Sequence, residues 1–293
     1  MFYVIIAKEN KFLFHQILEV EGVQRFNYHT HTERCHHAQP VFSDEDYVVA
    51  HIKSGFDAMA FTDHCPEKEI VDIRPHMRMS YAQRLEYLES IRKLQAKYEN
   101  QITIKSGYEI EFLPGQEENL FELKNEVDII ALGQHFVYDD SMERLLIFRH
   151  HVFTDEELER YADYIEEAVR LGLPDYIAHP DIYMIGRKKF GTIEEHICRR
   201  ICELAERYSI PLEINFGQIR ALKYGLIYSL DYPCRDFWRI VAEHNIKVIY
   251  GIDAHFRSEI EDVERSFGIV ESVLSPEIIS KLKFCNEQFE IIK

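Results

Sequence analysis

Potential metal ligands recur along the chain, and most of them follow a short apolar run typical of a buried strand. They are His29, His31 and His37 in NYHTHTERCHHA, His64 in FTDH, Glu109 in GYEIEF, His135 in GQHF, His179 in AHPD, and Asp253 and His255 in GIDAHF. Imidazole and carboxylate ligands suit Zn, Fe or Mn, whereas Ca prefers an all-oxygen shell. The residue types therefore predict a site for transition metals.

The spacing of His29 and His31 has a physical reason. Residues two apart on a strand project to the same side, so their two imidazoles can bind one ion together. A single histidine on a strand is more often a hydrogen-bonded structural residue. The repetition of ligand types after successive strands favours a metal site over that interpretation, because chance would scatter them.

Two of these positions have an alternative within the same motif. His36 could replace His37 as a ligand. Glu111 lies two residues after Glu109 and on the same strand face, so it could be the ligand instead, or it could meet a substrate ammonium.

The histidines outside the series lack placement at a strand end. Those in the leading segment, in helices or in a loop are interpreted as structural: His15, His51, His76, His196 and His244. His150 and His151 lie in the longest irregular segment, about 136–153, which is long enough to be a functional loop and could equally be a partly helical insertion. They are candidate substrate-loop residues.

Short β-rich runs alternate with longer segments of helical period, a pattern that predicts βα units around a parallel sheet or barrel. Strands are expected at 25–29, 58–62, 102–109, 128–132, 176–178, 211–214 and 247–250. Helices are expected at about 44–54, 80–98, 117–125, 155–171, 192–208, 233–245 and 259–273, with N-caps at Ser43, Ser80, Thr154 and Thr192. Because the carboxyl ends of barrel strands converge on one face, the ligands after these strands should meet there.

The composition is that of a soluble globular protein with a sizeable core. Of its 293 residues, 46% are hydrophobic and 29% are charged, and no repeat or flexible linker divides them. The formal charge of -17 argues against a general affinity for nucleic acid or anionic membranes. No signal peptide or membrane-spanning segment is expected.

The cysteine pattern favours a reducing cytoplasm, because six cysteines are scattered without the density of a disulfide scaffold. Cys198 and Cys202 lie four apart in a helical pattern and are interpreted as packing residues. Cys35 and Cys65 adjoin ligand positions and could be soft ligands. Neither has a paired cysteine, so both are interpreted as residues that pack beside the ligands or support them.

Taken in order, these motifs resemble the polymerase and histidinol phosphatase (PHP) superfamily, and within it the histidinol-phosphatase branch. The resemblance runs from His29 to His255 through HTHTERCHHA, AFTDHCP, GYEIEFLPG, GQHF, AHPD, LEINFGQIR and GIDAHF. It implies an α/β fold with a distorted seven-stranded (β/α)7 barrel of the TIM-like PHP type, as a single metallohydrolase domain over residues 1–293. Residues 1–24 precede the family core and form an amino-terminal extension of unknown role.

The resemblance also implies a centre of three divalent transition-metal ions, with Zn, Fe or Mn as candidates. Carried over by position, the ligands are His29, His31, His37, His64, Glu109, His135, His179, Asp253 and His255. A metal-bound water with a lowered pKa would attack phosphorus in line. Asp63 or Asp181 could assist the leaving alkoxide, but both are expected rather to orient the histidines beside them, His64 and His179.

Charge favours a phosphate substrate at such a centre despite the acidic chain. Three divalent ions carry about +6, and the two ligand carboxylates would leave roughly +4. Arg187 follows AHPDIYMIG and Arg220 follows LEINFGQ, and both are candidate phosphate-binding residues. A guanidinium donates two parallel hydrogen bonds to phosphate. A solvated surface arginine is the alternative for either residue.

The leading hypothesis is a phosphoric monoester hydrolase that converts L-histidinol phosphate to L-histidinol and phosphate in histidine biosynthesis. The motifs GYEIEFLPG and LEINFGQIR favour this member of the superfamily. The alternatives are a phosphoesterase for another small phosphate ester or nucleotide, a nuclease-like module, and a non-catalytic regulator stabilised by metal. The negative charge counts against the nuclease, so a small phosphorylated substrate is expected, without nucleic acid or membrane partners.

Overall fold

The computed structural model describes the chain except for residues 1–23, 69–76, 224, 226, 228 and 293. Nearly all of the predicted amino-terminal extension, residues 1–24, lies outside the described residues, as do His15 and His76. The organisation of residues 1–293 as one domain stays a prediction.

The centre of the fold is one parallel sheet of eight strands in the spatial order β1, β2, β3, β4, β7, β8, β9, β10. The strands are β1 (Phe26–Asn27), β2 (Ala58–Phe61), β3 (Thr103–Ile110), β4 (Ile129–Leu132), β7 (Tyr176–Ile177), β8 (Leu212–Asn215), β9 (Lys247–Gly251) and β10 (Lys283–Phe284). All the predicted strands are present. The short strand β10 was not predicted, because two residues carry no periodic signal.

The sheet curls until β1 approaches β9. Thr30 and Ala254 form a parallel bridge just beyond these strands. There His31 N donates to Ala254 O at 2.8 Å, and Ala254 N donates to His29 O at 3.2 Å. β10 pairs instead with the first residues of β9. The seven predicted strands therefore form the distorted barrel, which confirms the predicted fold class.

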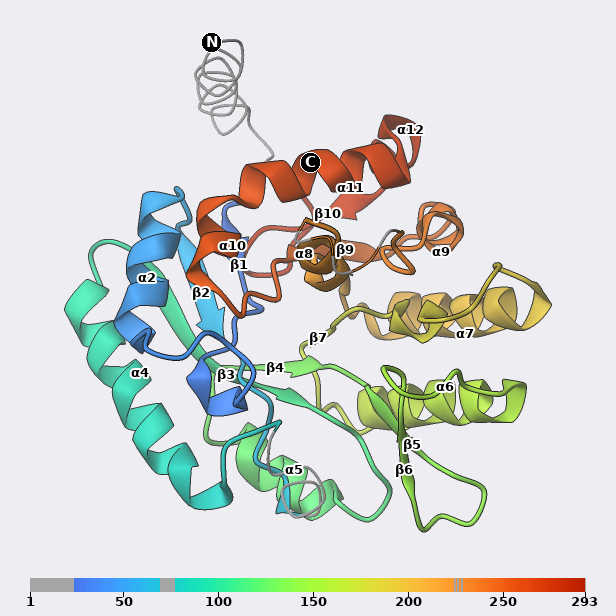
Figure 1. Cartoon of the computed structure of the whole chain (residues 1–293), viewed down its shortest axis with the longest axis horizontal. Coiled ribbons are helices and arrows are strands. Elements are labelled where there is room, and N and C mark those ends of the chain that lie inside the picture. The colour runs from blue at the N-terminus through green and yellow to red at the C-terminus, as the bar shows by residue number, and fades with distance from the viewer. Residues whose placement is uncertain (1–23, 69–76, 224, 226, 228, 293) are drawn as a thin grey trace.

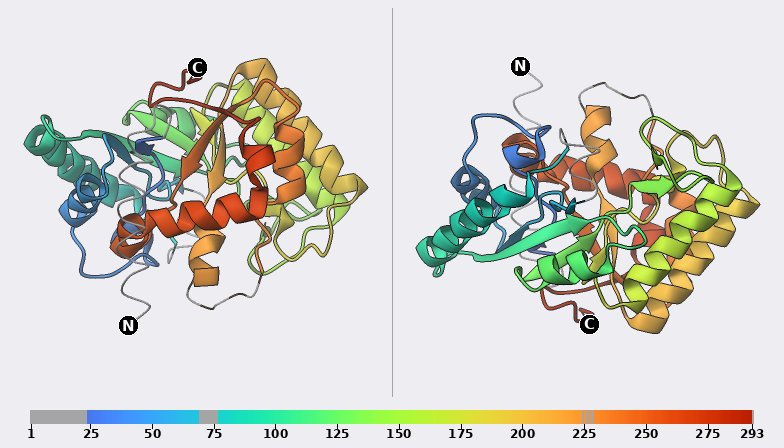
Figure 2. Two further views of the ribbon diagram at one scale, coloured as in Figure 1. Left: turned by 90° about the horizontal axis from the view of Figure 1, so that it is seen from above. Right: turned by 90° about the horizontal axis from the view of Figure 1, so that it is seen from below.

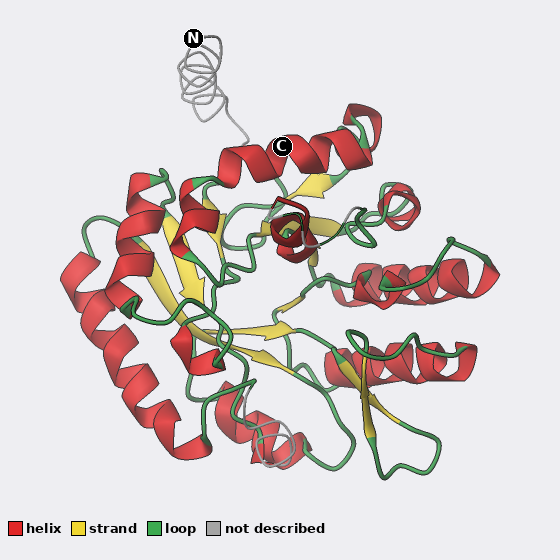
Figure 3. Cartoon of the chain, viewed as in Figure 1, coloured by secondary structure: helices red, strands yellow, loops and turns green. Residues whose placement is uncertain are grey.

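Helices lie mainly around the outer side of the curled sheet, and α8 (Gly217–Lys223) lies nearer the middle of the view in Figures 1 and 3. The helices are α2 (Asp44–Lys53), α4 (Arg84–Tyr98), α5 (Glu117–Lys124), α6 (Asp155–Arg170), α7 (Thr192–Tyr208), α8 (Gly217–Lys223), α9 (Arg235–Val241), α10 (Arg257–Glu261), α11 (Val263–Leu274) and α12 (Pro276–Ile279), with the 3-10 helices η1 (Glu33–Cys35), η2 (Tyr81–Gln83) and η3 (Ile182–Met184). The predicted helix 259–273 is divided into α10 and α11 at Asp262, whose backbone is not helical. α8 and α12 were not predicted.

Two predicted helix starts are capped as expected. Ser43 and Thr154 each accept a hydrogen bond from the backbone three residues further on, and a capping box completes both starts. Ser80 is the N-cap of the short helix η2, which leads into α4, and its N–H donates to Gln83 Oε1 at 2.8 Å. Thr192 was wrongly predicted as a cap, because Gly191 holds that position and its N–H donates to Glu194 Oε2 at 2.8 Å.

The irregular segment 136–153 contains an antiparallel hairpin of β5 (Phe136–Tyr138) and β6 (Leu145–Ile147). The expectation of a partly helical insertion is therefore wrong. Arg160 on α6 donates to Tyr138 O at 2.7 Å and ties the hairpin to the helix layer. Figure 2 shows the hairpin and α6 together at one side of the sheet.

Successive side chains on a strand point to opposite faces of the sheet, so they belong to two different apolar cores. Ala58 and Ala60 belong to the cluster inside the barrel, whereas Met59 belongs to the cluster between the sheet and the helices. Inside the barrel Tyr176 Oη donates to Tyr28 O at 2.8 Å, which connects β7 with the segment after β1. Small residues on β2 leave room for these rings.

The cysteines are unpaired, and no helix in the described part of the chain is long and apolar enough to cross a membrane. Cys198 and Cys202 are fully buried in the outer core, in agreement with a packing role. Cys65 is buried in the same core.

Candidate metal centre

The structure brings the side chains of the predicted ligands together at the carboxyl ends of the strands. His29 and His31 follow β1, His37 follows η1, His64 follows β2, Glu109 lies in β3, His135 follows β4, His179 follows β7, and Asp253 and His255 follow β9. All are buried except His37 and His135, which are partly exposed. We call these residues the histidine cluster.

Glu109 lies in the middle of the histidine cluster. Its Oε1 lies 2.8 Å from His179 Nε2 and 3.4 Å from His29 Nε2. Its Oε2 lies 2.8 Å from His64 Nδ1 and 3.5 Å from His31 Nε2. One carboxylate on β3 therefore faces imidazoles that arrive from three other strand ends.

Asp253 supplies the second carboxylate. Its Oδ1 lies 3.3 Å from His31 Nε2, 3.7 Å from His29 Nε2 and 3.4 Å from His255 Nδ1. The Nε2 atoms of His29 and His31 are only 3.1 Å apart. His29 and His31, which are expected from the sequence to project to the same side, thus both lie between the carboxylates of Glu109 and Asp253.

His37 lies on the partly exposed side of the histidine cluster. Its ring centroid is 4.7 Å from that of His255 and 5.2 Å from that of His64. Its Nδ1 lies 2.6 Å from Cys35 O, which leaves Nε2 for another partner. His36, the alternative, is exposed and has a left-handed backbone with φ of 60°. The geometry therefore favours His37.

Cys35 lies close enough to be considered as a ligand. Its Sγ is within 4.8 Å of ligand atoms of His31 and His255. The thiol donates to Thr32 O at 3.0 Å, and burial raises its pKa well above the usual value. A protonated, hydrogen-bonded thiol is a poor metal ligand, which agrees with the packing role predicted for Cys35.

Glu111 points to the back of His135 rather than into the middle of the histidine cluster. Its Oε2 accepts from His135 N at 2.7 Å, and its Oε1 lies 2.8 Å from His135 Nδ1. Glu111 is 1% exposed, so a substrate ammonium could not reach it. Its position leaves His135 Nε2 facing Glu109 Oε1 at 3.9 Å, and Glu109 is the carboxylate at the centre.

The electrostatics of part of the histidine cluster favour the protonation states that bind metal, whereas neighbouring carboxylates outweigh burial and raise the pKa values of His29 and His135. Burial by itself opposes ionisation of Glu109 and Asp253, but His64 lowers the pKa of Glu109, and His29 that of Asp253, well below the usual values. Burial lowers the pKa of His64 well below its usual value and that of His37 to about 4. Ionised carboxylates and neutral imidazoles are the forms that coordinate a metal ion.

Several buried polar atoms of the histidine cluster lack a hydrogen-bond partner among the described residues, as expected where a metal ion would bind. Among the residues that the structure describes, buried atoms of the cluster without a hydrogen-bond partner are His31 Nδ1, His64 Nδ1, Glu109 Oε2, His179 Nδ1 and His255 Nε2. Buried polar atoms normally have partners. His64 Nδ1 and Glu109 Oε2 lie 2.8 Å apart without the geometry of a hydrogen bond. A cation among these groups would satisfy such atoms, so the donor set fits divalent metal.

Two residues of the histidine cluster have a strained backbone. His179 has a φ of 31° and Asp253 a φ of 53°, in the left-handed region that most residues avoid. His179 lies two residues after the end of β7, and Asp253 lies two residues after the end of β9. Such strain persists only where the surrounding structure imposes it, and it is concentrated at functional sites.

Glu213 on β8 is a site residue that the sequence analysis missed. Both of its carboxylate oxygens lie 3.0 Å from His29 Nδ1, and the side chain is fully buried. Asn215 Nδ2 donates to Glu213 Oε1 at 2.6 Å. Because Glu213 occupies Nδ1, His29 Nε2 is left for metal. The signal was present in LEIN, where two polar residues two apart interrupt a buried strand.

Asp63 and Asp181 do not orient the histidines beside them, which corrects that prediction. Asp63 accepts from Thr32 N at 2.7 Å. Asp181 accepts from Cys234 N at 2.6 Å and from Trp238 Nε1 at 3.0 Å. Both aspartates are fully buried, and burial raises the pKa of Asp63 to about 6 and that of Asp181 to about 7. Their contacts join loops, and neither side chain is exposed to deliver a proton to a substrate.

Arg220 on α8 lies against the histidine cluster, as its candidate role in phosphate binding requires. Its Nη1 donates to Asp253 O at 3.0 Å and lies 2.8 Å from His255 Nδ1. Its Nε lies 3.4 Å from Glu259 Oε1. These contacts hold the guanidinium beside two predicted ligands.

Arg187 lies in different surroundings. Its Nη1 donates to Phe153 O at 2.6 Å, its Nε donates to Glu194, and its Nη2 lies 3.4 Å from Asp155 Oδ1. The guanidinium is therefore engaged with the start of α6 and α7. The structure does not support the predicted phosphate contact of Arg187.

Arg149 lies two residues after the end of β6 and was not predicted. Burial lowers the pKa of His37, and the positive charge of Arg149 lowers it further. Arg149 also opposes the rise in the pKa of Tyr232, which is caused mainly by burial. The Tyr232 ring lies 6.5 Å from that of His179. Arg149 is exposed and forms no ion pair with the described residues, so it brings an unneutralised positive charge near the open side.

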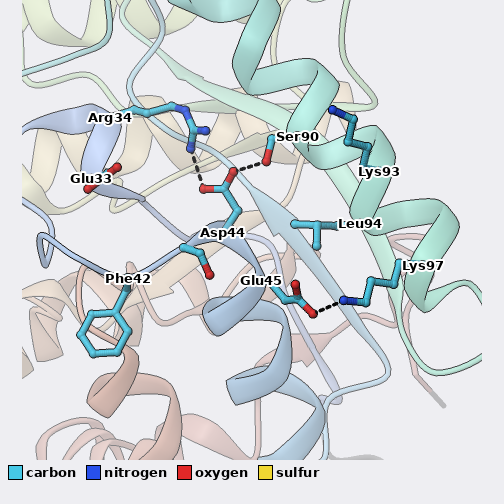
Figure 4. A pocket seen from close by; sticks show the side chains of 10 residues that line it. Glu33, Arg34, Phe42, Asp44, Glu45, Ser90, Lys93, Leu94 and Lys97 are labelled. Carbon is cyan, nitrogen blue, oxygen red and sulfur yellow. Dashed lines mark hydrogen bonds and ion pairs between the residues drawn. The ribbon is translucent and has the colours of Figure 1, made fainter.

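A groove of about 440 Å³ lies between η1, α2 and α4, away from the histidine cluster (Figure 4). Its lining includes none of the predicted ligands. Its positively charged groups have partners, because Arg34 pairs with Asp44 at 2.5 Å, Lys97 with Glu45 at 2.5 Å and Lys93 with Glu89 at 3.6 Å. We assign no ligand to this groove.

Comparison with known proteins agrees with this geometry. The family model described as the PHP domain matches residues 27–216, which is more than half of the chain. The chain belongs to the PHP family. All the ligands predicted from His29 to His179 lie in the matched part of this PHP chain, and Asp253 and His255 lie beyond it.

Several individual proteins are similar to this PHP chain. A probable histidinol-phosphatase of Deinococcus radiodurans is 28% identical over 248 residues, which is 79% of this chain and 86% of that protein. The putative histidinol phosphatase of Listeria monocytogenes has a similar structure, with a TM-score of 0.68 at 20% identity over 80% of this chain and 97% of the other. The histidinol phosphate phosphatase of Lactococcus lactis, solved with zinc, L-histidinol and phosphate, has a TM-score of 0.64 at 18% identity over 92% and 99%.

Proposed function

We propose that this PHP protein is a metal-dependent phosphomonoesterase that hydrolyses L-histidinol phosphate to L-histidinol and phosphate. The observation that carries the proposal is the meeting of the histidine cluster around Glu109 and Asp253, with Arg220 held against it. The names of the relatives in Deinococcus radiodurans and Lactococcus lactis support the choice of substrate.

The proposed metal ligands are His29, His31, His37, His64, Glu109, His135, His179, Asp253 and His255. The proposal is for three divalent ions of Zn, Fe or Mn, and the complex of the Lactococcus lactis relative with zinc supports zinc among them. When bound, such ions polarise phosphoryl oxygens and activate water for attack on phosphorus.

The residues of the chain itself hold this arrangement in place. Glu213 fixes the ring of His29, and Glu111 fixes the ring of His135, so that each presents Nε2 to the centre. Glu109 Oε1 lies 2.8 Å from His179 Nε2, and Asp253 Oδ1 lies 3.3 Å from His31 Nε2. The two carboxylates thereby keep these imidazoles close to the centre.

Arginines at the edge of the cluster are proposed to bind the phosphate. Arg220 is fixed by Asp253 O and His255 and can direct its remaining nitrogen to a phosphate oxygen. Arg149 brings a second positive charge from the segment after the hairpin, near His37. A phosphate dianion is thereby attracted to the site although the chain has a formal charge of -17.

The proposed substrate is a small phosphorylated molecule, and the six free cysteines fit the cytoplasm as the proposed compartment. Neither nucleic acid nor a membrane is needed by the proposed reaction.

The test is an assay of the metal-loaded protein against a panel of phosphate esters, nucleotides and single-stranded DNA. We expect the highest kcat/KM for L-histidinol phosphate, and we expect Asp253→Asn to abolish its hydrolysis because one of the two carboxylates is neutralised. A chelator should abolish activity, and added Zn or Mn should restore it. Equal hydrolysis of unrelated esters, or preferred cleavage of DNA, would overturn the substrate assignment, and activity that persists without metal would overturn the mechanism.

A further inference from the structure

A buried ionic network lies behind His135. Arg78 is 1% exposed and Glu67 is fully buried. Arg78 Nη1 lies 2.9 Å from Glu67 Oε2 and donates to Cys65 O at 3.0 Å. Glu67 Oε1 accepts from Glu111 N at 2.7 Å. Arg78 Nη2 lies 3.8 Å from Glu111 Oε1.

The network reaches the histidine cluster through one residue. Glu111 accepts from both the backbone N and the ring Nδ1 of His135, at 2.7 and 2.8 Å. Two bonds to one carboxylate fix the position of His135 and require a proton on Nδ1. Only Nε2 is then left as a metal ligand.

The energetics indicate a role in positioning. An arginine and two glutamates without access to water carry a large desolvation cost, which a buried ion pair often fails to repay. Arg78 and both glutamates lie away from solvent, so neither solubility nor substrate contact explains them. Glu67 follows β2, Glu111 follows β3 and His135 follows β4, so the network joins three neighbouring strand ends.

We propose that Arg78 and Glu67 position Glu111, and that Glu111 thereby selects the tautomer in which His135 binds metal. The inference rests on the proposed metal centre but assigns functions to residues that touch neither metal nor substrate. Arg78 and Glu111 are positioning residues for the part of the centre that includes His135.

The most direct variant is Glu111→Gln, which keeps the size of the side chain. Its single amide oxygen can accept from His135 N or from Nδ1, but not from both in the native way. When the oxygen accepts the backbone N–H, the amide NH2 faces Nδ1 and favours the proton on Nε2. We expect metal bound through His135 to be weakened roughly 10- to 100-fold.

A second pair of variants tests the outer part of the network. Arg78→Met alone removes the positive charge that balances Glu67, so Glu67→Gln/Arg78→Met is made as a charge-balanced partner. Arg84→Met is the matched control, because Arg84 also forms an arginine–glutamate pair, with Glu126 at 3.1 Å, but nearer the surface. The double variant should weaken metal binding in the same direction as Glu111→Gln, and Arg84→Met should not.

The readouts are zinc bound per chain against a graded chelator, and the tautomer of His135 followed by 1H–15N spectroscopy of the zinc-free protein. We expect both Glu111→Gln and the double variant to lose one class of bound zinc at a lower chelator concentration than the others. In the zinc-free protein, both should raise the fraction of His135 that carries its proton on Nε2. Circular dichroism of every variant checks the fold.

Several results would overturn the inference. Unchanged zinc retention and an unchanged His135 tautomer in folded Glu111→Gln would do so. Equal weakening of every class of zinc, or the same loss in Arg84→Met, would show a general effect on stability instead. If the double variant does not fold, Glu111→Gln alone decides. Zinc binding by the unaltered protein is measured first, because its absence would refute the proposed function itself.

Discussion

Gly133 and Glu109 are packed so closely that a Cβ at position 133 would overlap the Glu109 carboxylate. Gly133 follows β4, which is the neighbour of β3, where Glu109 lies. The absence of a side chain on one strand end thus makes room for the central carboxylate of the histidine cluster. Gly251 and Glu213 have the same relationship on β9 and β8.

Gly133→Ala should therefore displace Glu109 and disrupt the metal centre while most of the barrel stays folded. We expect kcat/KM to fall by roughly 100-fold or more, together with a lower zinc content. Gly268→Ala is the matched control, because a Cβ there meets nothing within 4 Å. It should leave activity unchanged and stabilise α11 by about 0.5–1 kcal/mol. Full activity of Gly133→Ala would contradict the central position of Glu109.

Glu213→Gln should weaken metal binding because the amide no longer holds His29 with a carboxylate. The expected loss is roughly 10- to 100-fold in zinc affinity, measured by competition with a chelator. Glu206→Gln provides the control, since Glu206 contacts His244 Nδ1 at 3.2 Å on the surface. If both variants retain zinc equally well, the orienting role of Glu213 is wrong.

Arg149→Ala should raise KM for the phosphate ester more than it lowers kcat. A charged hydrogen bond to phosphate contributes about 1.5–3 kcal/mol, which corresponds to roughly 10- to 100-fold. Arg144→Ala, in the turn of the neighbouring hairpin, is the control, because Arg144 contacts Asp139 instead. Steady-state kinetics at several phosphate concentrations would also reveal weaker product inhibition. An unchanged KM would remove Arg149 from the phosphate site.

Arg187→Ala should lower stability rather than substrate binding. The variant removes the arginine that pairs with Glu194 Oε1, and Glu194 is only 5% exposed, so the lost ion pair leaves a buried charge uncompensated. We expect a lower Tm in thermal unfolding with KM unchanged. A raised KM with an unchanged Tm would restore Arg187 as a phosphate-binding residue.

Asp181 should make the stability of the metal-free protein depend on pH. Burial raises its pKa to about 7 in the folded state, above the value near 4 of an exposed aspartate. The folded state then binds the proton more strongly, so its stabilising contribution is present below about pH 4 and is lost as pH rises towards 7.

The comparison with Asp181→Asn isolates this effect. Urea unfolding at several pH values should show a loss on the order of a few kcal/mol in the unaltered protein, and the variant should lack that loss. Asp57→Asn, at an exposed ion pair with Arg25, should follow the unaltered protein. Identical pH profiles for Asp181→Asn and the unaltered protein would show that Asp181 is ionised in the folded state.

Much of the barrel could be predicted from the sequence because its signals are local. Apolar runs such as 129–132 are long enough to mark a strand, and capping residues such as Ser43 and Thr154 mark the following helices. β10 and α12 were missed because two to four residues are too short for a period. The hairpin of β5 and β6 was missed because its turn does not carry a strong glycine signal.

The sequence by itself determined the ligand types and their order, since residues after parallel strands must converge whatever the exact packing. Tertiary structure decided what each polar residue contacts. Glu109 and Glu111 are two apart, yet one faces the middle of the cluster and the other the back of His135. Asp181 bonds to Trp238 rather than to the adjacent histidine. Such pairings join residues far apart in the chain, so spacing cannot specify them and only packing does.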